Sequence, residues 1–219
     1  MPVTLPPEFW QLEREKLLAI LLPRIQRAVL VGLAFGGQGV SRFAIGFDNA
    51  MAQTRAADWA RQHTDNLLNT IWQTNQSVVG SVIENWNRTP CATRADLVQS
   101  LQQVLDTNVS RANSIGVTEV TRAVAQGNIE AYAEAGAAAP PTWTDRTGTR
   151  PFGPPLHPNC RCASSFARYK DAWVMVWYTK NDDLRCKTPT NTPFGIVKGC
   201  ADMHGRIISA GEYLGRRIK

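Results

Sequence analysis

The sequence predicts a mainly α-helical protein: a long-helix N-terminal domain followed by a small basic α+β module with short strands and clustered cysteines. Apolar residues recur at three- and four-residue intervals through the first 136 residues, the period of helices that bury one face. Short segments punctuated by proline and glycine replace this pattern afterwards. Four of the five cysteines follow residue 159. We therefore expect two domains, at residues 1–136 and 137–219.

The first helix is expected to begin near Pro6 and Pro7, because proline is tolerated in the first turn of a helix. Its apolar positions are Trp10, Leu17, Leu18, Leu21, Ile25 and Val29. Pro23 should kink or split this helix, since it lacks a backbone donor. The segment 36–39, Gly-Gly-Gln-Gly, lacks the Gly-Lys-Ser/Thr ending of a phosphate loop and is expected to form a turn.

A second helix is predicted from Asp48 to Trp86, a long polar stretch without proline. Its expected apolar face comprises Trp59, Leu67, Leu68, Ile71, Trp72, Val78, Val79, Ile83 and Trp86. The segment Asn87–Cys91 should break the helix. Thr93 and Asp96 then form the pattern of an N-terminal cap, which predicts that another helix starts there.

A further helical stretch is expected at Val109–Ala135, interrupted by Gly116 and Gly127 and closed by Gly136. Residues 137–141, Ala-Ala-Ala-Pro-Pro, indicate a linker. In the following module the apolar run Trp173–Tyr178 predicts a strand, and Arg206–Ser209 a weaker one.

The positive charge lies in the second half of the chain. Residues 1–109 carry nine Lys+Arg and nine Asp+Glu, whereas residues 110–219 carry fifteen and nine. Such an end favours a polyanion or an acidic protein surface, and ordinary solubility is the alternative. No membrane partner is expected, because the apolar segment Leu17–Phe35 is interrupted by Pro23, Arg24 and Arg27.

A nine-residue segment, Pro154–Cys162, reads Pro-Pro-Leu-His-Pro-Asn-Cys-Arg-Cys. Its prolines predict a rigid extended turn that presents His157, Cys160 and Cys162, a spacing suited to metal ligation or to cross-linking with other cysteines. Cys186 and Cys200 are the downstream candidates. No secretory leader is apparent, so a reducing compartment is expected and zinc is favoured over a disulfide. One disulfide, or a stiff loop with inert thiols, stays an alternative.

Cys91 lies apart from this set and is expected to be a free thiol. We expect the other four cysteines, with His157 near them, to gather in space.

Three groups of residues carry a resemblance to a known family. The first is Val117–Ala123 with Gly127 and Glu130–Gly136, and the second is Pro154–Cys162. The third group is Trp177, Asp183, Cys186, and Cys200–Gly205 with its His204. Together they resemble the phage minor head proteins of the Mu F type, also called head morphogenesis proteins. The Cys-x-x-Cys pair of that family is widened here, and it follows the His-Pro-x-Cys-Arg-Cys motif instead of preceding it. Either the module is permuted, or residues 165–219 are an unrelated tail.

The resemblance implies a structural minor capsid protein with several copies per particle, located inside the virion and, during assembly, in the host cytoplasm. Its implied partners are portal protein, major capsid protein or scaffold, and packaged double-stranded DNA, with roles in head assembly and in DNA packaging or ejection. The basic end would contact phosphates without reading sequence. The expected contacts are Arg206, Arg216, Arg217 and Lys219.

The alternative function is a phage-borne effector whose C-terminal module is a toxin-like enzyme. Its candidate residues would be His157, His204, Asp182, Asp183 and Glu212. None of these lies at a recognised catalytic spacing. We therefore expect no catalytic residues and no enzyme.

Overall fold

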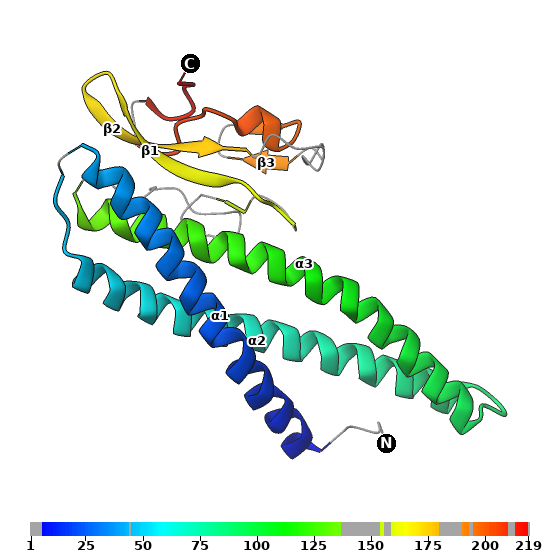
Figure 1. The fold of residues 1–219 in the computed structure, drawn as a ribbon. Coiled ribbons are helices and arrows are strands. Elements are labelled where there is room, and N and C mark those ends of the chain that lie inside the picture. Colours follow the sequence, from blue (N-terminus) through cyan, green and yellow to red (C-terminus); the bar gives the residue numbers. More distant parts are fainter. Residues whose placement is uncertain are drawn as a thin grey trace. The chain divides into compact units, whose positions relative to one another are not determined.

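The computed structural model describes residues 6–43, 45–136, 154–155, 159–179, 190–192, 195–209 and 213–218. Three long helices come first: α1 (Pro7–Ser41), α2 (Asn49–Arg88) and α3 (Arg94–Glu134). Short elements follow (Figure 1). They are β1 (Ala163–Tyr169), β2 (Ala172–Tyr178), β3 (Thr190–Thr192), β4 (Gly195–Val197) and the 3₁₀ helix η1 (Cys200–Met203). The predicted mainly α class, with short strands and clustered cysteines, is confirmed.

Helix α1 runs without a break through Pro23 and through the Gly-rich segment 36–39. Of the two predicted effects of Pro23, a kink or a split, the split is therefore excluded, and the predicted turn at the glycines is wrong. The glycines serve close packing instead: a Cβ atom on Gly37 would lie 2.5 Å from the Phe47 ring, and one on Gly36 would lie 2.6 Å from Ala131. Space, and not backbone freedom, explains why glycine occupies these positions.

Helix α3 is likewise continuous, so the predicted interruptions at Gly116 and Gly127 are wrong. Gly127 lies where α3 crosses α1, and a Cβ there would come within 2.0 Å of the Val29 carbonyl oxygen. Gly32 is its counterpart on α1, because a Cβ there would come within 2.0 Å of the Val124 oxygen. The predicted end of the helix at Gly136 is confirmed, with a φ of 61°.

Helix α2 begins where the sequence predicts. The Asp48 carboxylate accepts hydrogen bonds from the backbone N–H groups of Ala50 and Met51, at 2.9 and 3.0 Å. The most buried face of α2 shares Leu68, but none of the tryptophans, with the predicted apolar face. It follows a four-residue spacing of mostly small side chains, namely Ala52, Ala56, Ala60, Thr64 and Leu68. Small residues allow neighbouring helices to approach closely.

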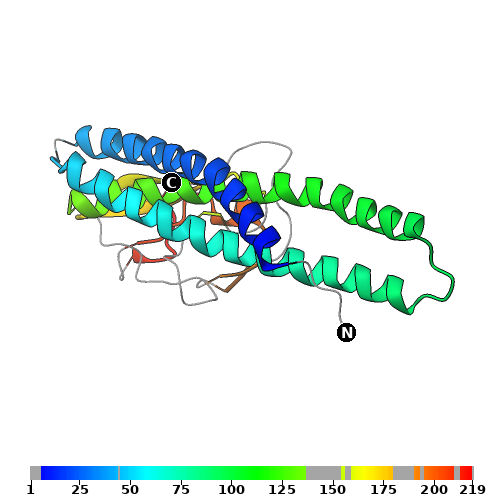
Figure 2. The same ribbon diagram turned by 90° about the horizontal axis from the view of Figure 1, so that it is seen from below.

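The connection between α2 and α3 is a short turn (Figure 2). The Trp86 indole N–H donates to the Thr93 carbonyl oxygen at 2.7 Å. Thr93 and Asp96 form the predicted cap: the Thr93 N–H donates to the Asp96 carboxylate at 2.7 Å, and the Asp96 N–H donates to the Thr93 hydroxyl at 3.3 Å. Both the break and the restart of the helix are confirmed.

The chain divides into two compact units. The first comprises residues 1–24 and 61–114, and the second comprises residues 25–60 and 115–219. In the first unit an ion pair between Arg14 and Asp65, 2.9 Å apart, links α1 to α2. The units do not follow the predicted boundary at residue 136, because parts of all three helices belong to the unit that contains the strands.

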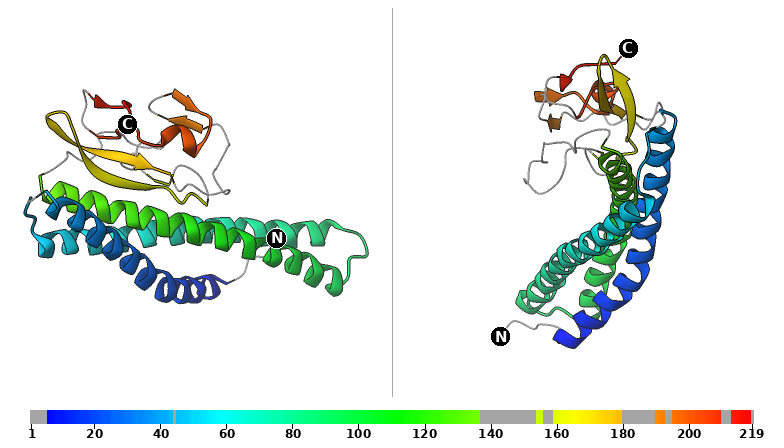
Figure 3. Two further views of the ribbon diagram at one scale, coloured as in Figure 1. Left: turned by 45° about the horizontal axis from the view of Figure 1, so that its top comes forward. Right: turned by 90° about the vertical axis from the view of Figure 1, so that its left-hand side faces the viewer.

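The second unit is built around the antiparallel hairpin β1–β2, in which Ala163 pairs with Tyr178 and Tyr169 with Ala172. Figure 3 shows this hairpin beside the C-terminal part of α3. One core cluster joins the hairpin to the helices, and it contains Leu33, Val40, Ala52, Ile129, Ala131, Tyr132, Phe166, Met175 and Trp177. The other sheet face packs a smaller cluster of Val174, Val176, Ile207 and Tyr213.

The predicted strand at Trp173–Tyr178 is confirmed as β2. The weaker one at Arg206–Ser209 is not an element of its own, yet it lies along β2: Val176 and Ile207 form an isolated antiparallel bridge, and the Ile208 N–H donates to the Met175 oxygen at 2.8 Å. Strand β1 was not predicted, because its Ala- and Ser-rich sequence lacks the β-branched residues typical of strands.

By length and composition alone, α1 could cross a membrane; 28% of its most apolar window is buried within the structure. Ile25, Val29 and Leu33 of this helix are core residues, each at most 3% exposed. The expectation that the protein has no membrane partner stays a prediction.

Candidate metal centre

The segment that carries Cys160 and Cys162 lies along α3. The Thr118 hydroxyl accepts a hydrogen bond from the Asn159 N–H at 2.9 Å, and the Thr121 hydroxyl donates to the Cys160 carbonyl oxygen at 2.6 Å. Residues three apart share a helix face, so one face of α3 holds two successive residues of the turn. Asn159 has a φ of 60°, a left-handed conformation that asparagine tolerates better than most residues.

The same face of α3 continues to hold the chain after the cysteines. The Asn128 amide donates to the Ser164 carbonyl oxygen at 3.2 Å, and Tyr132 stacks on Phe166 with ring centroids 5.0 Å apart. Cys162, directly before β1, is therefore fixed between contacts on both sides. These α3 residues are ones that sequence reasoning did not assign to the site.

Cys200 comes from the opposite end of the module. It opens η1, and the residue before it, Gly199, has a φ of 130°, which favours glycine. The Asp202 carboxylate accepts a hydrogen bond from the Lys198 N–H at 2.7 Å, which closes the turn around Gly199 and Cys200. The turn thereby fixes the backbone position of Cys200.

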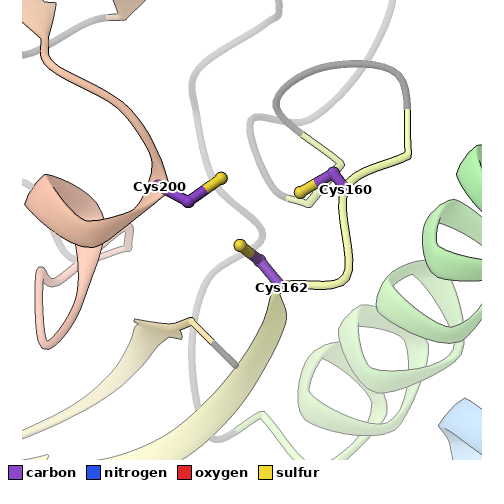
Figure 4. A group of neighbouring side chains, drawn as sticks. All are labelled: Cys160, Cys162 and Cys200. Carbon is purple, nitrogen blue, oxygen red and sulfur yellow. The ribbon is translucent and has the colours of Figure 1, made fainter. Parts of the chain in front are cut away.

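The three thiols meet in the interior. The Sγ atoms of Cys160, Cys162 and Cys200 all lie within 4.8 Å of one another, and the side chains point toward a common centre (Figure 4). The residues are 1%, 6% and 3% exposed. Two thiolates on one tetrahedral zinc ion are roughly 3.8 Å apart, given Zn–S bonds of about 2.3 Å. The cluster is therefore close to the size that a shared ion requires.

The thiols are strongly perturbed. The hydrogen bond from Cys160 and burial raise the pKa of the Cys162 thiol to about 12, against opposing contributions from the hydrogen bonds to Cys200 and to the Trp177 indole. Hydrogen bonds to Cys160 and Cys162, with burial, raise the pKa of Cys200 as well. Without a cation the Cys162 and Cys200 thiols thus stay protonated at neutral pH.

Of the five predicted metal ligands, the structure brings together Cys160, Cys162 and Cys200. His157 and Cys186 lie outside the described residues, so the prediction for them is untested. None of the described cysteines is in a disulfide, and Cys91 is free and exposed, as predicted. His204, part of the motif after Cys200, is engaged elsewhere: its Nδ1 atom lies 3.1 Å from the Thr179 hydroxyl.

The predicted phosphate contacts have different surroundings. Arg206 and Arg217 both donate to the Asp202 carbonyl oxygen, each at 2.7 Å, so they hold the end of the chain in place. Arg216 is exposed and lies over the Tyr213 ring, with 5.6 Å between its Cζ atom and the ring centroid. Lys219 lies outside the described residues. Of the candidate effector residues, Asp182, Asp183 and Glu212 also lie outside them.

Comparisons with family models, with curated proteins and with solved structures found no match. The resemblance to the phage minor head proteins therefore rests on the motifs of this sequence.

Proposed function

We propose that this protein is a structural minor head protein of a phage, of the Mu F type, that docks near the portal or capsid and contacts packaged DNA without sequence preference. One observation supports this above the others. The three groups of residues that carry the resemblance lie together: Thr118 and Thr121 of the first hold Asn159 and Cys160 of the second, and Cys200 of the third contributes to the same cluster. A chance likeness in three separate segments gives no reason for them to meet.

The chemistry of the cluster supports a structural role over an enzymatic one. A nucleophilic cysteine is partly exposed and has a lowered pKa, whereas the Cys162 thiol is buried and has a raised one. His204, the described histidine of the same module, lies against Thr179 and outside the thiol cluster. These surroundings suit a group that stabilises the fold.

We also propose that the cluster holds zinc through Cys160, Cys162 and Cys200, with the fourth ligand supplied by Cys186 or His157. Three thiolates and one further sulfur or nitrogen are a common donor set for structural zinc. The ion would compensate the buried thiolates and join the turn before β1 to η1. A small module with few long apolar runs gains most from such a link.

The proposed function is tested by locating the protein in assembled particles. Expressed with portal and capsid proteins, it should co-purify with heads and lie as internal density near the portal vertex. A variant with His204→Ala should assemble equally well, because this imidazole is outside the cluster. Toxicity of the protein expressed alone, abolished by a single polar substitution, would instead support the effector alternative.

A further inference from the structure

The tip of the β1–β2 hairpin combines exposed cations with aromatic rings. Two residues, Lys170 and Asp171, connect the strands between the pair Tyr169 and Ala172. Lys170 has a φ of 54°, a left-handed conformation that a lysine rarely adopts and that glycine or asparagine adopts more easily. The sequence thus places a cation at a position where local conformation favours an uncharged residue.

The C-terminal segment adds a second cation to the same ring. The Nζ atom of Lys170 lies 5.5 Å from the Tyr213 ring centroid, and the Cζ atom of Arg216 lies 5.6 Å from it. Tyr169 packs edge-on against Tyr213, with centroids 5.4 Å apart. Cation–π contacts thus place both charges at one ring, and they do not neutralise these charges.

Among the residues that the structure describes, the charges at the hairpin tip are mainly positive. Arg168, Lys170 and Arg216 are exposed, and none of them forms an ion pair with a carboxylate among the residues that the structure describes. The neighbouring acid is Asp171, which accepts a hydrogen bond from the Tyr213 hydroxyl at 2.6 Å. Among the described residues Arg168, Lys170, Asp171 and Arg216, three cations therefore stand against one carboxylate.

We propose that these residues, Arg168, Lys170, Arg216, Tyr169 and Tyr213, form the surface through which the protein contacts the phosphate backbone of double-stranded DNA. We call them the hairpin-tip patch. The inference rests on the proposed function, because it identifies the DNA contact within it. It also replaces Arg206 and Arg217 as primary contacts, since their guanidinium groups hold the Asp202 carbonyl in the fold. Exposed cations that hold their positions on aromatic rings can meet successive phosphates without a change in the fold.

The test uses the full-length protein and a random-sequence DNA duplex, with binding measured by fluorescence anisotropy between about 50 and 200 mM salt. The variants are Lys170→Asn, Arg216→Gln and the double variant. Each single variant should lower the slope of log K against log salt by about 1, and the double variant by about 2. Lys16→Gln, which removes an exposed lysine of α1, is the charge-matched control and should leave the slope unchanged.

Folding is checked in the same samples. Lys170→Asn should melt at the same temperature as the wild type or higher, because asparagine accepts the left-handed conformation. Weaker DNA binding in a variant that is at least as stable cannot come from unfolding.

The outcomes separate the two proposals. A wild-type protein that does not bind the duplex at low salt would overturn the DNA contact of the proposed function, and this inference with it. A wild type that binds, with a double variant of unchanged affinity and slope, would overturn the hairpin-tip patch and leave DNA contact standing.

Discussion

At the scale of single residues, the cysteines that the structure describes fall into two chemical groups. Cys91 is exposed in the turn between α2 and α3, whereas Cys160, Cys162 and Cys200 are buried within reach of one another. Mutual hydrogen bonds and burial raise the pKa of Cys162 and Cys200 and so disfavour their thiolate forms unless a cation is present. We therefore expect Cys91 to react with thiol reagents and the three buried cysteines to bind metal.

We expect iodoacetamide at pH 8 to label Cys91 faster than the three clustered cysteines by at least about tenfold, because Cys91 is exposed whereas the clustered cysteines are buried. Mass spectrometry of the labelled peptides measures the rates. Raising the pH to 9 should leave the clustered cysteines the slower group. Equal rates in the native protein would mean that the cluster is open to solvent.

We expect purified protein to contain about one zinc ion per chain, and Cys162→Ser to lose it. Cys91→Ser is the matched control and should keep the full metal content. Because binding displaces protons from the thiols, zinc affinity should fall as the pH falls. Elemental analysis gives the stoichiometry; a metal content unaffected by Cys162→Ser would exclude this site.

The predicted gathering of Cys160, Cys162 and Cys200 is confirmed, but what holds them was not predicted, and Cys186 lies outside the described residues. The pattern His-x₂-Cys-x-Cys pointed to Cys160 and Cys162, and Cys200 was expected to join them because clustered thiols can share a metal ion or a cross-link. The anchoring by Thr118 and Thr121 could not be predicted, since threonines at helical spacing have many uses. Their identity as site residues depends on the path of a chain segment far away in sequence.

At the scale of elements, glycines allow the helices α1 and α3 to pack closely. Where α1 crosses α3, the backbone at Gly32 and Gly127 comes too close for a Cβ atom. Sequence analysis interpreted such glycines as breaks, because local propensity disfavours glycine within a helix. Tertiary contact outweighed that local preference. No local pattern distinguishes Gly127, which lies at the crossing, from Gly116, which has open space around it.

These two glycines of α3 form a matched pair for experiment. Gly127→Ala should lower the free energy of unfolding by about 1–3 kcal/mol, since its methyl group would lie 2.0 Å from the Val29 oxygen and force the helices apart. Gly116→Ala should raise it by about 0.5–1 kcal/mol, because nothing lies within 4 Å. Urea denaturation measures both; the same sign for both variants would contradict the crossing.

The start of α3 depends on its cap. Thr93→Ala should cost about 1 kcal/mol and should speed amide hydrogen exchange in the first turn of α3. The contacts with Thr93 hold the pKa of Asp96 below its usual 3.8. Because the pKa is lower in the folded state, the cap contributes at neutral pH and is lost as the pH falls through that lowered value. In the Thr93→Ala variant this acid dependence should be weaker.

At the scale of the whole molecule, the packing units do not coincide with the change from helices to strands. Each long helix contributes residues to both units, and the second unit combines helical segments with the strands and the cysteine cluster. The predicted domains at 1–136 and 137–219 followed the change in sequence pattern, which marks where secondary structure changes. The packing units depend instead on the helix faces that the β1–β2 hairpin covers. Contacts such as the stacking of Tyr132 on Phe166 determine these faces.

The division predicts where metal removal acts. A chelator should raise hydrogen exchange in the second unit, at β1, β2 and the end of α3, while the parts of α2 and α3 in the first unit keep their protection. Hydrogen exchange with mass spectrometry, before and after chelation, resolves these segments. Cys162→Ser should reproduce the pattern without chelator. An equal rise in both units would show that the cluster stabilises the entire chain instead of one unit.

The cysteine cluster also has a consequence for the time course of synthesis. Cys160 and Cys162 leave the ribosome well before Cys200, and at roughly 5–20 residues per second several seconds separate them. During that interval α3 is already made, and Thr118 and Thr121 are available to hold the nascent turn against it. The sulfur atoms of Cys160 and Cys162 are thus expected to be held against α3 before Cys200 has been synthesised. Capture of an ion would then mark the moment at which the hairpin has been synthesised and closed.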